Sequence, residues 1–476
     1  MNKGVFRQYL AAFIGSLAAM VAGTSYGWVT PLLSNFHDPR GDLPLTHEES
    51  SWVVALIEFG NLFTSIPTGI LVDRWGRKLF LLGTAPIYIF SWVLILTTRS
   101  VNVLYFVRII QGLAMGVIYT ALPVYLAEIS TPDIRGALTT FFEGMWYLGI
   151  LLEYILGPFL SYSTFTLVTL TVPVVFLVTF VWVPESPYFL IMKGHEESAV
   201  NSLEWLRGSK NVREEFNLIK KTVNEEQNDN RSWKDLIATK SDVRALLIVE
   251  IVVLTKFMSG ISAVLSYSSD MFASTAHSAL TADHYTIIMG LLLLVTTILA
   301  GSLVDRAGRR PLLLISCLGC GLSEFSAGLY CFLDSKIPLD VSGYDWIFML
   351  SIMTYCFIFS LGLGPLVNTL KGEIFPSSTK GFGSGLTTMT DTISCFVCLK
   401  IYQVITDSYG VFLNFWIFSA FSFFGAVVIY FIVPETKGKT FSEIQKSLGV
   451  PKHSPIAIVQ YDFNAANEQI EIIAED

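Results

Sequence analysis

The sequence has little charge for its length. Charged residues make up 15% of the 476 residues and hydrophobic residues 52%, whereas a soluble domain carries roughly 25% charged residues. The apolar residues fall in runs of about twenty, the length that a helix needs to cross roughly 30 Å of hydrocarbon. This composition argues against an ordinary soluble protein and indicates a membrane protein that crosses the bilayer many times.

The chain also lacks an excess of positive charge and a disulfide framework. Its formal net charge is −8, and no basic patch accompanies aromatic residues, so nucleic acid is not an expected partner. All six cysteines lie in late apolar segments, and the pair Cys395-x-x-Cys398 is expected to pack inside a membrane helix. Motifs of phosphate-binding loops, zinc proteases and serine hydrolases are missing. We therefore expect no enzymatic activity, no metal and no cofactor.

Twelve apolar windows divide into two groups of six. We predict an all-α membrane protein with twelve transmembrane helices in two six-helix bundles, joined by helices of a cytoplasmic linker. The predicted spans are 8–30, 52–72, 79–98, 103–125, 137–160, 164–183, 245–268, 286–304, 311–333, 346–370, 381–406 and 411–433. The predicted domains are an N-terminal bundle over 1–183, a linker over 184–243, a C-terminal bundle over 244–433 and a cytoplasmic tail over 434–476.

The distribution of basic residues predicts the orientation in the membrane. If both termini are cytoplasmic, most of the 31 Lys and Arg residues lie inside, and the outer segments hold only Arg40, Arg99 and Lys336. The opposite orientation would reverse this asymmetry. We expect a multi-pass protein of the plasma membrane that works as a monomer, with lipid around it and a small-molecule solute as its partner.

Three motifs occur once in each half of the chain. The first pair is Gly69-Ile-Leu-Val-Asp73-Arg74-Trp-Gly76-Arg77-Lys78 and Gly301-Ser-Leu-Val-Asp305-Arg306-Ala-Gly308-Arg309-Arg310. The others pair Glu128-Ile129 and Arg135-Gly136 with Glu373-Ile374 and Lys380-Gly381, and Pro184-Glu185-Ser186 with Pro434-Glu435-Thr436. These repeats indicate a duplicated six-helix unit. Parallel repeats of this kind place a solute site between the halves, near the midplane of the membrane.

These motifs resemble those of the sugar porters of the major facilitator superfamily. Further matches are Arg108-x-x-x-Gly112-x-x-x-Gly116, Pro123-x-Tyr125-x-x-Glu128, Pro187 after Ser186, and Lys437-Gly438 after Thr436. The stretch from Phe396 to Gln403 resembles the insect trehalose-transporter branch. The resemblance implies transport of a hexose or a trehalose-like sugar by alternating access. Proton symporters of the family pair a first-helix Asp with the fourth-helix Arg; here Arg108 has no such partner in sequence, which favours a facilitator.

Acidic residues at the inner helix ends are not explained by orientation alone, because Asp and Glu contribute little to it. We expect opposite charges there to hold the cytoplasmic side shut and to separate when it opens. Single solvent-exposed pairs are weak, so the network matters more than any one pair. The candidate gate residues are Asp73, Arg74, Glu128, Arg135, Glu185, Asp305, Arg306, Glu373, Lys380 and Glu435.

The solute-contacting positions implied by the resemblance depart from the family pattern. The seventh-helix motif Gln-Gln-Leu-Ser-Gly-Ile-Asn becomes Lys256-Phe257-Met258-Ser259-Gly260-Ile261-Ser262. A fifth-helix Gln becomes Tyr154, a tenth-helix Trp becomes Asn368, and an eleventh-helix Asn becomes Asp391. Amides that bind sugar hydroxyls are therefore lost. The candidate solute-binding residues are Glu153, Tyr154, Lys256, Phe257, Ser259, Ser262, Asn368 and Asp391.

Lys256 is the most unusual of these residues, since a lysine near the midplane must pair, face water or lose its proton. Asp391 lies at a similar depth and is the favoured partner, with Glu153 second; alternatively, Lys256 contacts the solute. Two other functions remain open. The chain could carry a non-sugar solute through a pocket that uses Lys256, Phe257, Asn368 and Asp391, or it could be a transporter-like solute sensor.

Overall fold

The computed structural model describes residues 3–39, 43–227, 237, 240–275, 281–337, 342–375, 380–437, 439 and 443–444, and these residues form helices and connecting turns without a strand. The first half contains α1 Lys3–Gly27, η1 Thr30–Leu32, α2 Leu33–His37, α3 His47–Trp75, α4 Arg77–Thr97, α5 Val101–Ile129, α6 Pro132–Leu156 and α7 Tyr162–Phe180. Three short helices follow: α8 Pro187–Met192, α9 Glu196–Arg207 and α10 Arg213–Gln227. The second half contains α11 Lys240–Met258, α12 Ile261–Thr275, α13 Ala282–Ala307, α14 Arg309–Lys336, η3 Ser342–Tyr344, α15 Asp345–Leu361, α16 Leu363–Ile374, α17 Lys380–Tyr409 and α18 Val411–Ile432.

Twelve helical segments correspond to the twelve predicted spans. In the described part of the chain, nine segments are long and apolar enough to cross a membrane, and the bent helix α3 makes a tenth. The other two are α6 and α17, which are equally long but carry ionisable residues in their interiors, among them Glu143, Glu153 and Asp391. The predicted all-α membrane fold is confirmed.

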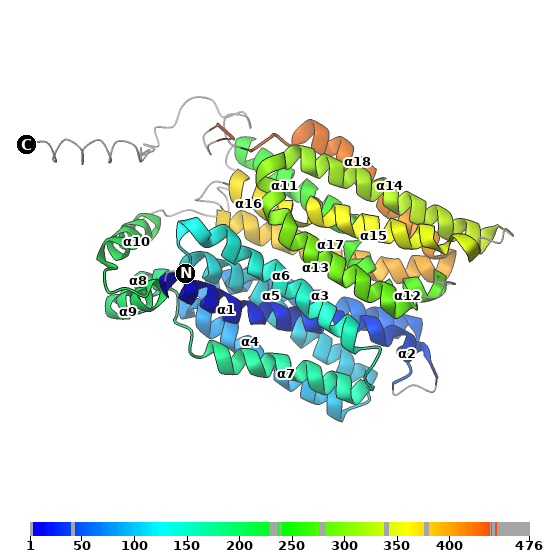
Figure 1. The fold of residues 1–476 in the computed structure, drawn as a ribbon, viewed down its shortest axis with the longest axis horizontal. Coiled ribbons are helices and arrows are strands. Elements are labelled where there is room, and N and C mark those ends of the chain that lie inside the picture. The colour runs from blue at the N-terminus through cyan, green and yellow to red at the C-terminus, as the bar shows by residue number, and fades with distance from the viewer. Residues whose placement is uncertain are drawn as a thin grey trace, which may run out of the picture.

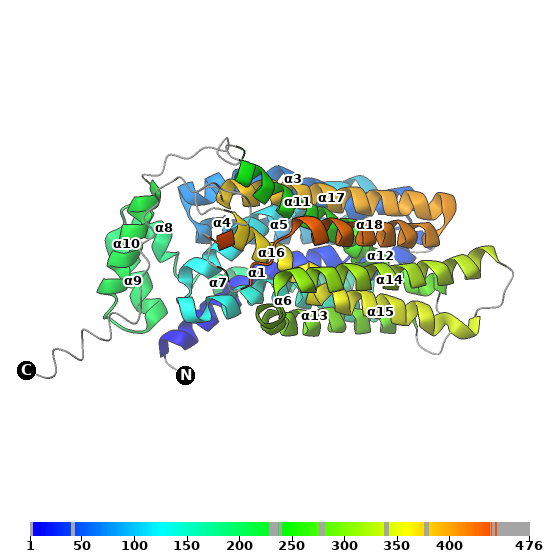
Figure 2. The ribbon, with the colours of Figure 1, turned by 90° about the horizontal axis from the view of Figure 1, so that it is seen from above.

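The helices form two bundles that lie side by side. Figure 1 shows α1 and α3–α7 in one bundle, α11–α18 in the other, and α8–α10 beyond one end of both. Figure 2 shows the same end from a perpendicular direction, with the start of the chain near it. We call this end the linker side and the opposite end the far side. Both bundles therefore present their helix ends to the same two sides.

The three linker helices share a small core of their own and dock on the first bundle. Leu203 and Phe216 belong to that core. The Arg7 guanidinium donates to the Trp205 carbonyl oxygen at 3.0 Å, and Arg207 donates to the Ile129 carbonyl oxygen at 2.9 Å. These contacts attach α9 to the linker-side ends of α1 and α5. The helices fall within the predicted linker interval 184–243, whereas most of the predicted tail 434–476 lies outside the described residues.

Two membrane segments of the second bundle are broken. The segment α11–α12 breaks at Gly260, whose φ of 81° is readily adopted only by glycine, and a Cβ there would lie 2.3 Å from the Phe418 ring. A break frees backbone groups that lipid cannot satisfy, so other parts of the protein must bind them. The Tyr355 hydroxyl donates to the Ser259 carbonyl oxygen at 2.8 Å. At the second break, between α15 and α16, the Leu363 N–H donates to the Ser316 hydroxyl at 3.1 Å.

Candidate transport site and gates

An ion-pair network closes the linker-side end of the first bundle. Arg77 begins α4 and lies 2.9 Å from Glu128, which is in the last turn of α5. The same guanidinium lies 2.9 Å from Asp73, one turn earlier in α3. Only 4% of the Arg77 side chain is exposed, so the pair holds the ends of three helices together in a largely dry setting.

The second bundle repeats this arrangement. Arg309 begins α14 and lies 2.9 Å from Glu373 near the end of α16. The other Glu373 oxygen accepts from the Thr436 hydroxyl at 2.6 Å. The Arg309 and Glu373 side chains are 12% and 26% exposed, so this pair is wetter than its counterpart. The repeated motifs thus produce the same contact twice, from matching helices.

Two glycines make room for a second carboxylate in each network. Gly76 and Gly308 have φ of 106° and 93°, and a Cβ would lie 2.5 Å from a Glu185 oxygen and 3.0 Å from a Glu435 oxygen, respectively. Glu185 accepts the backbone N–H of Lys78 at 3.1 Å. Glu435 accepts the N–H groups of the two residues that follow Gly308, at 3.0 and 3.2 Å. Each carboxylate therefore caps the N-terminus of a membrane helix, where negative charge is favoured.

The two capping carboxylates differ in their electrostatics. Burial raises the pKa of Glu185 above its usual value, and the N–H groups of Ser186 and Lys78 only partly oppose this effect. Burial also acts on Glu435, but four backbone N–H groups outweigh it and lower its pKa. Equivalent positions in the two halves thus hold one carboxylate that resists ionisation and one that favours it.

The ion pairs described so far stay within one bundle. Their acidic members are among the candidate gate residues, whereas Arg77 and Arg309 are not, although both stand in the repeated motif. Arg74 is exposed and lies over the Trp75 ring, and Arg135 is exposed near the start of α6. The side chains of Asp305, Arg306 and Lys380 lie outside the part of the chain that the structure describes. A latch between the bundles remains a prediction.

The bundles meet through hydrogen bonds toward the far side. The carbonyl oxygen of Leu265 in α12 accepts from the Thr30 hydroxyl at 3.2 Å and from the Tyr154 hydroxyl at 2.6 Å. The Lys400 ammonium in α17 donates to the Ser51 hydroxyl in α3 at 2.7 Å. These contacts join residues of the first half to residues of the second. The structure is therefore closed between the bundles at this level.

His37 adds another contact between the two bundles at the far side. Its Nδ1 lies 4.0 Å from Asp270 of the second bundle, and its ring centroid lies 4.1 Å from that of His47. Deeper in the protein, Asn61 donates to Glu58 at 3.0 Å and to the Thr392 hydroxyl at 3.3 Å. The far-side closure thus extends from the surface to the middle of α3 and α17.

The predicted ion pair between Lys256 and Asp391 is not formed in this structure. Asp391 pairs instead with Lys371 of α16, at 3.2 Å. The Lys256 ammonium lies 5.2 Å from the centroid of the neighbouring Phe257 ring and has no carboxylate within 4 Å among the described residues. Lys371 is nine residues after the break at Gly362 and beside α17, a position that equal depth along two helices could not reveal.

Asn368 provides a contact between the bundles on the linker side of their centre. Its amide donates to a Glu143 oxygen at 3.1 Å, which joins α16 to α6. Glu143 also interacts electrostatically with Lys256, Asp391 and Lys371. These charged groups therefore surround the meeting point of the two halves. Glu143 and Lys371 were not among the candidate solute-binding residues.

Other candidate residues have different roles in the structure. Glu153 is fully buried and both of its oxygens accept from the Thr169 hydroxyl of α7, so it faces the interior of its own bundle. Tyr154 takes part in the far-side closure described above. Ser259 donates to the Lys256 carbonyl oxygen at the break of α11. Ser262 accepts from the Cys395 thiol at 3.0 Å. Glu153 is therefore neither a partner of Lys256 nor a group on the bundle interface.

Arg108 is buried and bonded to neutral groups. Its Nε donates to the Val53 carbonyl oxygen at 2.8 Å, and one terminal nitrogen donates to the carbonyl oxygen of Ser25 at 2.6 Å and to Gln111 at 3.2 Å. No carboxylate in the described residues lies within 4 Å of it. Backbone carbonyls of α1 and α3 thus occupy the place of an acidic partner.

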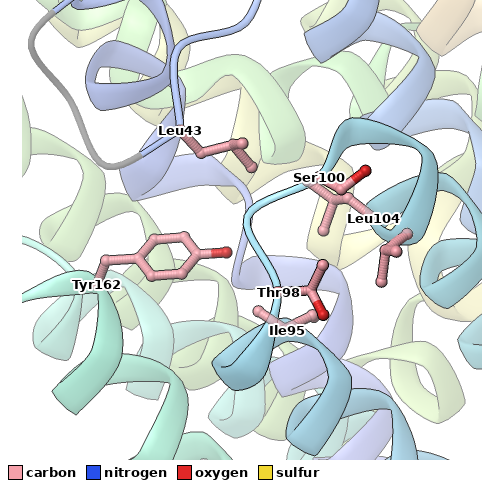
Figure 3. A pocket seen from close by; sticks show the side chains of 7 residues that line it. Leu43, Ile95, Thr98, Ser100, Leu104 and Tyr162 are labelled. Carbon is pink, nitrogen blue, oxygen red and sulfur yellow. The ribbon is translucent and has the colours of Figure 1, made fainter.

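A small pocket on the far side lies away from these groups. Figure 3 shows its lining side chains, which come from the far-side ends of α4, α5 and α7 and from Leu43. All belong to the first bundle, and none is ionisable except the phenol of Tyr162. In the described ranges, no three His, Cys, Asp or Glu side chains are placed to hold a metal ion. The bundle interface is therefore the candidate transport site.

Twelve membrane helices in two bundles, with matching charge networks and a polar interface between them, define a transporter rather than an enzyme. A model of the family described as "Sugar (and other) transporter" matches residues 7–448. The chain belongs to this family, the sugar porters of the major facilitator superfamily, and the resemblance inferred from its motifs is confirmed.

The curated relatives and solved structures agree with this placement. The facilitated trehalose transporter Tret1 of Bombyx mori is 31% identical over 447 residues, which make up 93% of this chain and 87% of that protein. The Tret1 protein of Culex quinquefasciatus is 31% identical over 449 residues, or 94% and 86% of the two chains. The partially occluded inward-open structure of the E. coli xylose transporter XylE has a TM-score of 0.76 at 21% identity, covering 91% and 99%. That likeness shows the fold.

Proposed function

We propose that this protein moves a neutral sugar, a hexose or a trehalose-like disaccharide, across the membrane by facilitated alternating access. The observation that carries the proposal is the similarity, along nearly the whole chain, to proteins described as facilitated trehalose transporters. The interface between the bundles adds support, because it presents amide, carboxylate and ammonium groups that can bind hydroxyls.

The surroundings of Arg108 support facilitated transport. Coupling to protons requires a group that gains and loses a proton as the bundles move, and the expected carboxylate beside this arginine is replaced by carbonyl oxygens. A carbonyl does not titrate. The hydrogen bonds of Arg108 therefore join α1, α3 and α5 through acceptors that do not titrate.

The charge balance at the interface favours a neutral solute over an anion. Lys371 and Asp391 form an ion pair there, so the positive charge of one group is balanced by the negative charge of the other. A carrier of an anionic solute would be expected to keep an excess of positive charge at this place. The sensor alternative has no specific observation in its favour.

The contacts at the two ends suggest which state the structure represents. We assign the linker side to the cytoplasm, because the repeated basic motifs lie there. The bundles are joined toward the far side and near the centre, where Asn368 donates to Glu143, whereas the ion pairs at the linker-side ends stay within one bundle. This is the pattern of a carrier closed to the outside. In the opposite state, the bundles 1–183 and 244–433 would rock until the linker-side charges form the latch between them.

Vesicle uptake tests the proposed solute and mechanism together. Purified protein in liposomes should accumulate labelled glucose or trehalose to the level of the outside solution and no further, because a facilitator only equilibrates its solute. An imposed pH gradient should leave the final level unchanged. Accumulation above equilibrium under an inward proton gradient would contradict the facilitator, and failure to take up any neutral sugar would contradict the sugar assignment.

Single-cysteine labelling tests the orientation in the plasma membrane. The native cysteines are all buried, so they give little background. An impermeant thiol reagent on intact cells should label Ser163→Cys on the far side and should not label Glu197→Cys in α9, although both positions are exposed. Labelling of Glu197→Cys alone would reverse the orientation. We expect the labelled protein to be monomeric in mild detergent.

A further inference from the structure

Four ionisable side chains, one from each of four helices, meet where the two bundles touch. We call Glu143, Lys256, Lys371 and Asp391 the central tetrad. Glu143 in α6 and Asp391 in α17 each lie eleven residues after the linker-side start of their helix, which corresponds to a depth of about 17 Å. Charges at such depth are expensive and are generally functional.

Lys371 is the member of the tetrad that fixes the state of Asp391. Its ammonium lies 3.2 Å from Asp391 Oδ2, and the lysine is only 9% exposed. The other oxygen, Oδ1, is buried and has no hydrogen-bond partner in the described part of the protein. A buried acceptor without a partner is costly unless a ligand or water binds it. The contact with Lys371 therefore uses one carboxylate oxygen of Asp391 and leaves the other as an acceptor at the interface.

Asn368 places Lys371 on the face of α16 that meets the first bundle. The two residues are three positions apart, so they share one face of the helix. Asn368 is exposed and its amide reaches across to Glu143. Lys371 is thus one helical turn from the contact between the bundles. Glu143 of the first bundle interacts electrostatically with Lys371 and Lys256 of the second bundle.

We propose that Lys371 determines specificity by acting as a charge filter: it neutralises Asp391 at the bundle interface, so that the site admits neutral polyhydroxyl solutes and rejects charged sugars of either sign. This inference rests on the proposed sugar transport. The pair of Lys371 and Asp391 has no net charge. Removing Lys371 leaves it with one excess negative charge, and removing the charge of Asp391 leaves one excess positive charge.

The size of the effect follows from the geometry. One uncompensated charge within about 8 Å of a charged solute, at an effective dielectric constant near 20, changes the solute affinity by roughly tenfold or more. Each single substitution should therefore shift the solute preference toward the sugar whose charge is opposite to the excess charge it leaves. A role limited to folding would lower the amount of protein without changing the ratio between solutes.

Uptake of three matched hexoses tests the filter: glucose, its amino derivative and its uronic acid, at pH 6 so that the amine is charged. Relative to glucose, Lys371→Met should favour the amino sugar about tenfold, and Asp391→Asn should favour the uronic acid about tenfold. The double variant should return to the neutral preference. Lys371→Arg keeps the charge and should keep the preference, and Lys336→Met on the exposed far-side end of α14 is the matched lysine control. Unchanged ratios in well-expressed Lys371→Met would overturn the proposal.

A second readout reports on the filter without transport. Asn368→Cys is exposed at the tetrad, so its reaction rates with cationic and anionic thiol reagents in inside-out vesicles measure the local potential. Adding Lys371→Met should shift the rate ratio about tenfold toward the cationic reagent. If the wild type carries no sugar, the proposed function fails, while this ratio still decides the filter. A ratio that Lys371→Met leaves unchanged would show that the lysine does not set the potential.

Discussion

The two bundles end alike and differ in the middle. At the linker side each bundle has an Arg–Glu pair, which is Arg77–Glu128 in the first half and Arg309–Glu373 in the second. Each bundle also has a glycine of positive φ and a carboxylate that caps a helix. In the middle, only the second bundle has the breaks at Gly260 and Gly362, and it supplies three of the four tetrad residues. The duplicated unit thus kept the parts that join helices within a bundle, while the groups offered to a solute became concentrated in one half.

The difference has a physical basis. A continuous helix satisfies its own backbone and offers only side chains, whereas a broken helix in a membrane must find new partners for the freed groups. In the second bundle, Tyr355 and Ser316 supply those partners. The breaks at Gly260 and Gly362 therefore depend on precise packing, and this dependence can be tested by paired substitutions.

The largest effect is expected at the break of α11–α12. Gly260→Ala forces a residue with a side chain into a positive φ and places its Cβ against the Phe418 ring, so we expect a loss of ~3 kcal/mol in the free energy of unfolding. In the first bundle, Gly144→Ala meets no atom within 4 Å and should be neutral or stabilising by up to ~1 kcal/mol. Thermal unfolding in detergent measures both. Equal melting temperatures would mean that the break tolerates a side chain.

The next effect separates the two Arg–Glu pairs. Glu128→Gln leaves Arg77, which is almost fully buried, with the exposed Asp73 as its remaining carboxylate partner, and should destabilise the protein by ~3 kcal/mol. Glu373→Gln removes one carboxylate from an arginine that is better solvated and should cost ~1 kcal/mol. The same thermal unfolding assay compares them. A larger loss for Glu373→Gln would indicate that burial does not rank these pairs.

The effects of Glu128→Gln and Glu373→Gln on the transport rate should not follow the order of their effects on stability. If these carboxylates also form the latch between bundles, Glu373→Gln should slow sugar exchange while equilibrium sugar binding changes little. The matched control is Glu197→Gln on the exposed surface of α9, which should leave the rate unchanged. Normal exchange by both Glu128→Gln and Glu373→Gln would show that the network stabilises each bundle and takes no part in gating.

The smallest changes in stability are expected for substitutions of the two capping carboxylates, and these changes depend on pH. Glu435 has a lowered pKa in the folded protein, so its contribution is complete above the pKa of the unfolded chain and is lost as the pH falls through the folded value. Glu435→Gln should therefore cost ~1 kcal/mol at pH 7 and nothing in strong acid. Glu185 has a raised pKa, so its ionisation opposes folding as the pH rises, and Glu185→Gln should be neutral or slightly stabilising at pH 7. Melting temperatures from pH 4 to pH 8 distinguish the two; identical pH profiles for the variants would contradict the difference in burial.

Particular residues show how far the sequence could be used to predict the site. Asp391 and Asn368 were selected because they replace sugar-contacting positions of the family, and both lie at the bundle interface. Glu153 is a candidate because it precedes Tyr154, which occupies a sugar-contacting position of the family, but it faces Thr169 inside its own bundle. Alignment with a motif gives a position along a helix; a shift of one residue turns a side chain by about 100°, which separates Glu153 from Tyr154.

The sequence by itself determined the membrane fold, the twelve spans, the duplication and the family, because runs of apolar residues and repeated motifs express constraints that act locally along the chain. The tertiary structure alone decided the partners of the buried charges. Lys371 rather than Lys256 neutralises Asp391, and Tyr154 closes the far side by reaching the Leu265 carbonyl oxygen. Such pairs depend on the rotation and separation of helices that are distant in sequence. Those quantities are fixed only when the bundles pack, since an ion pair requires approach within about 4 Å.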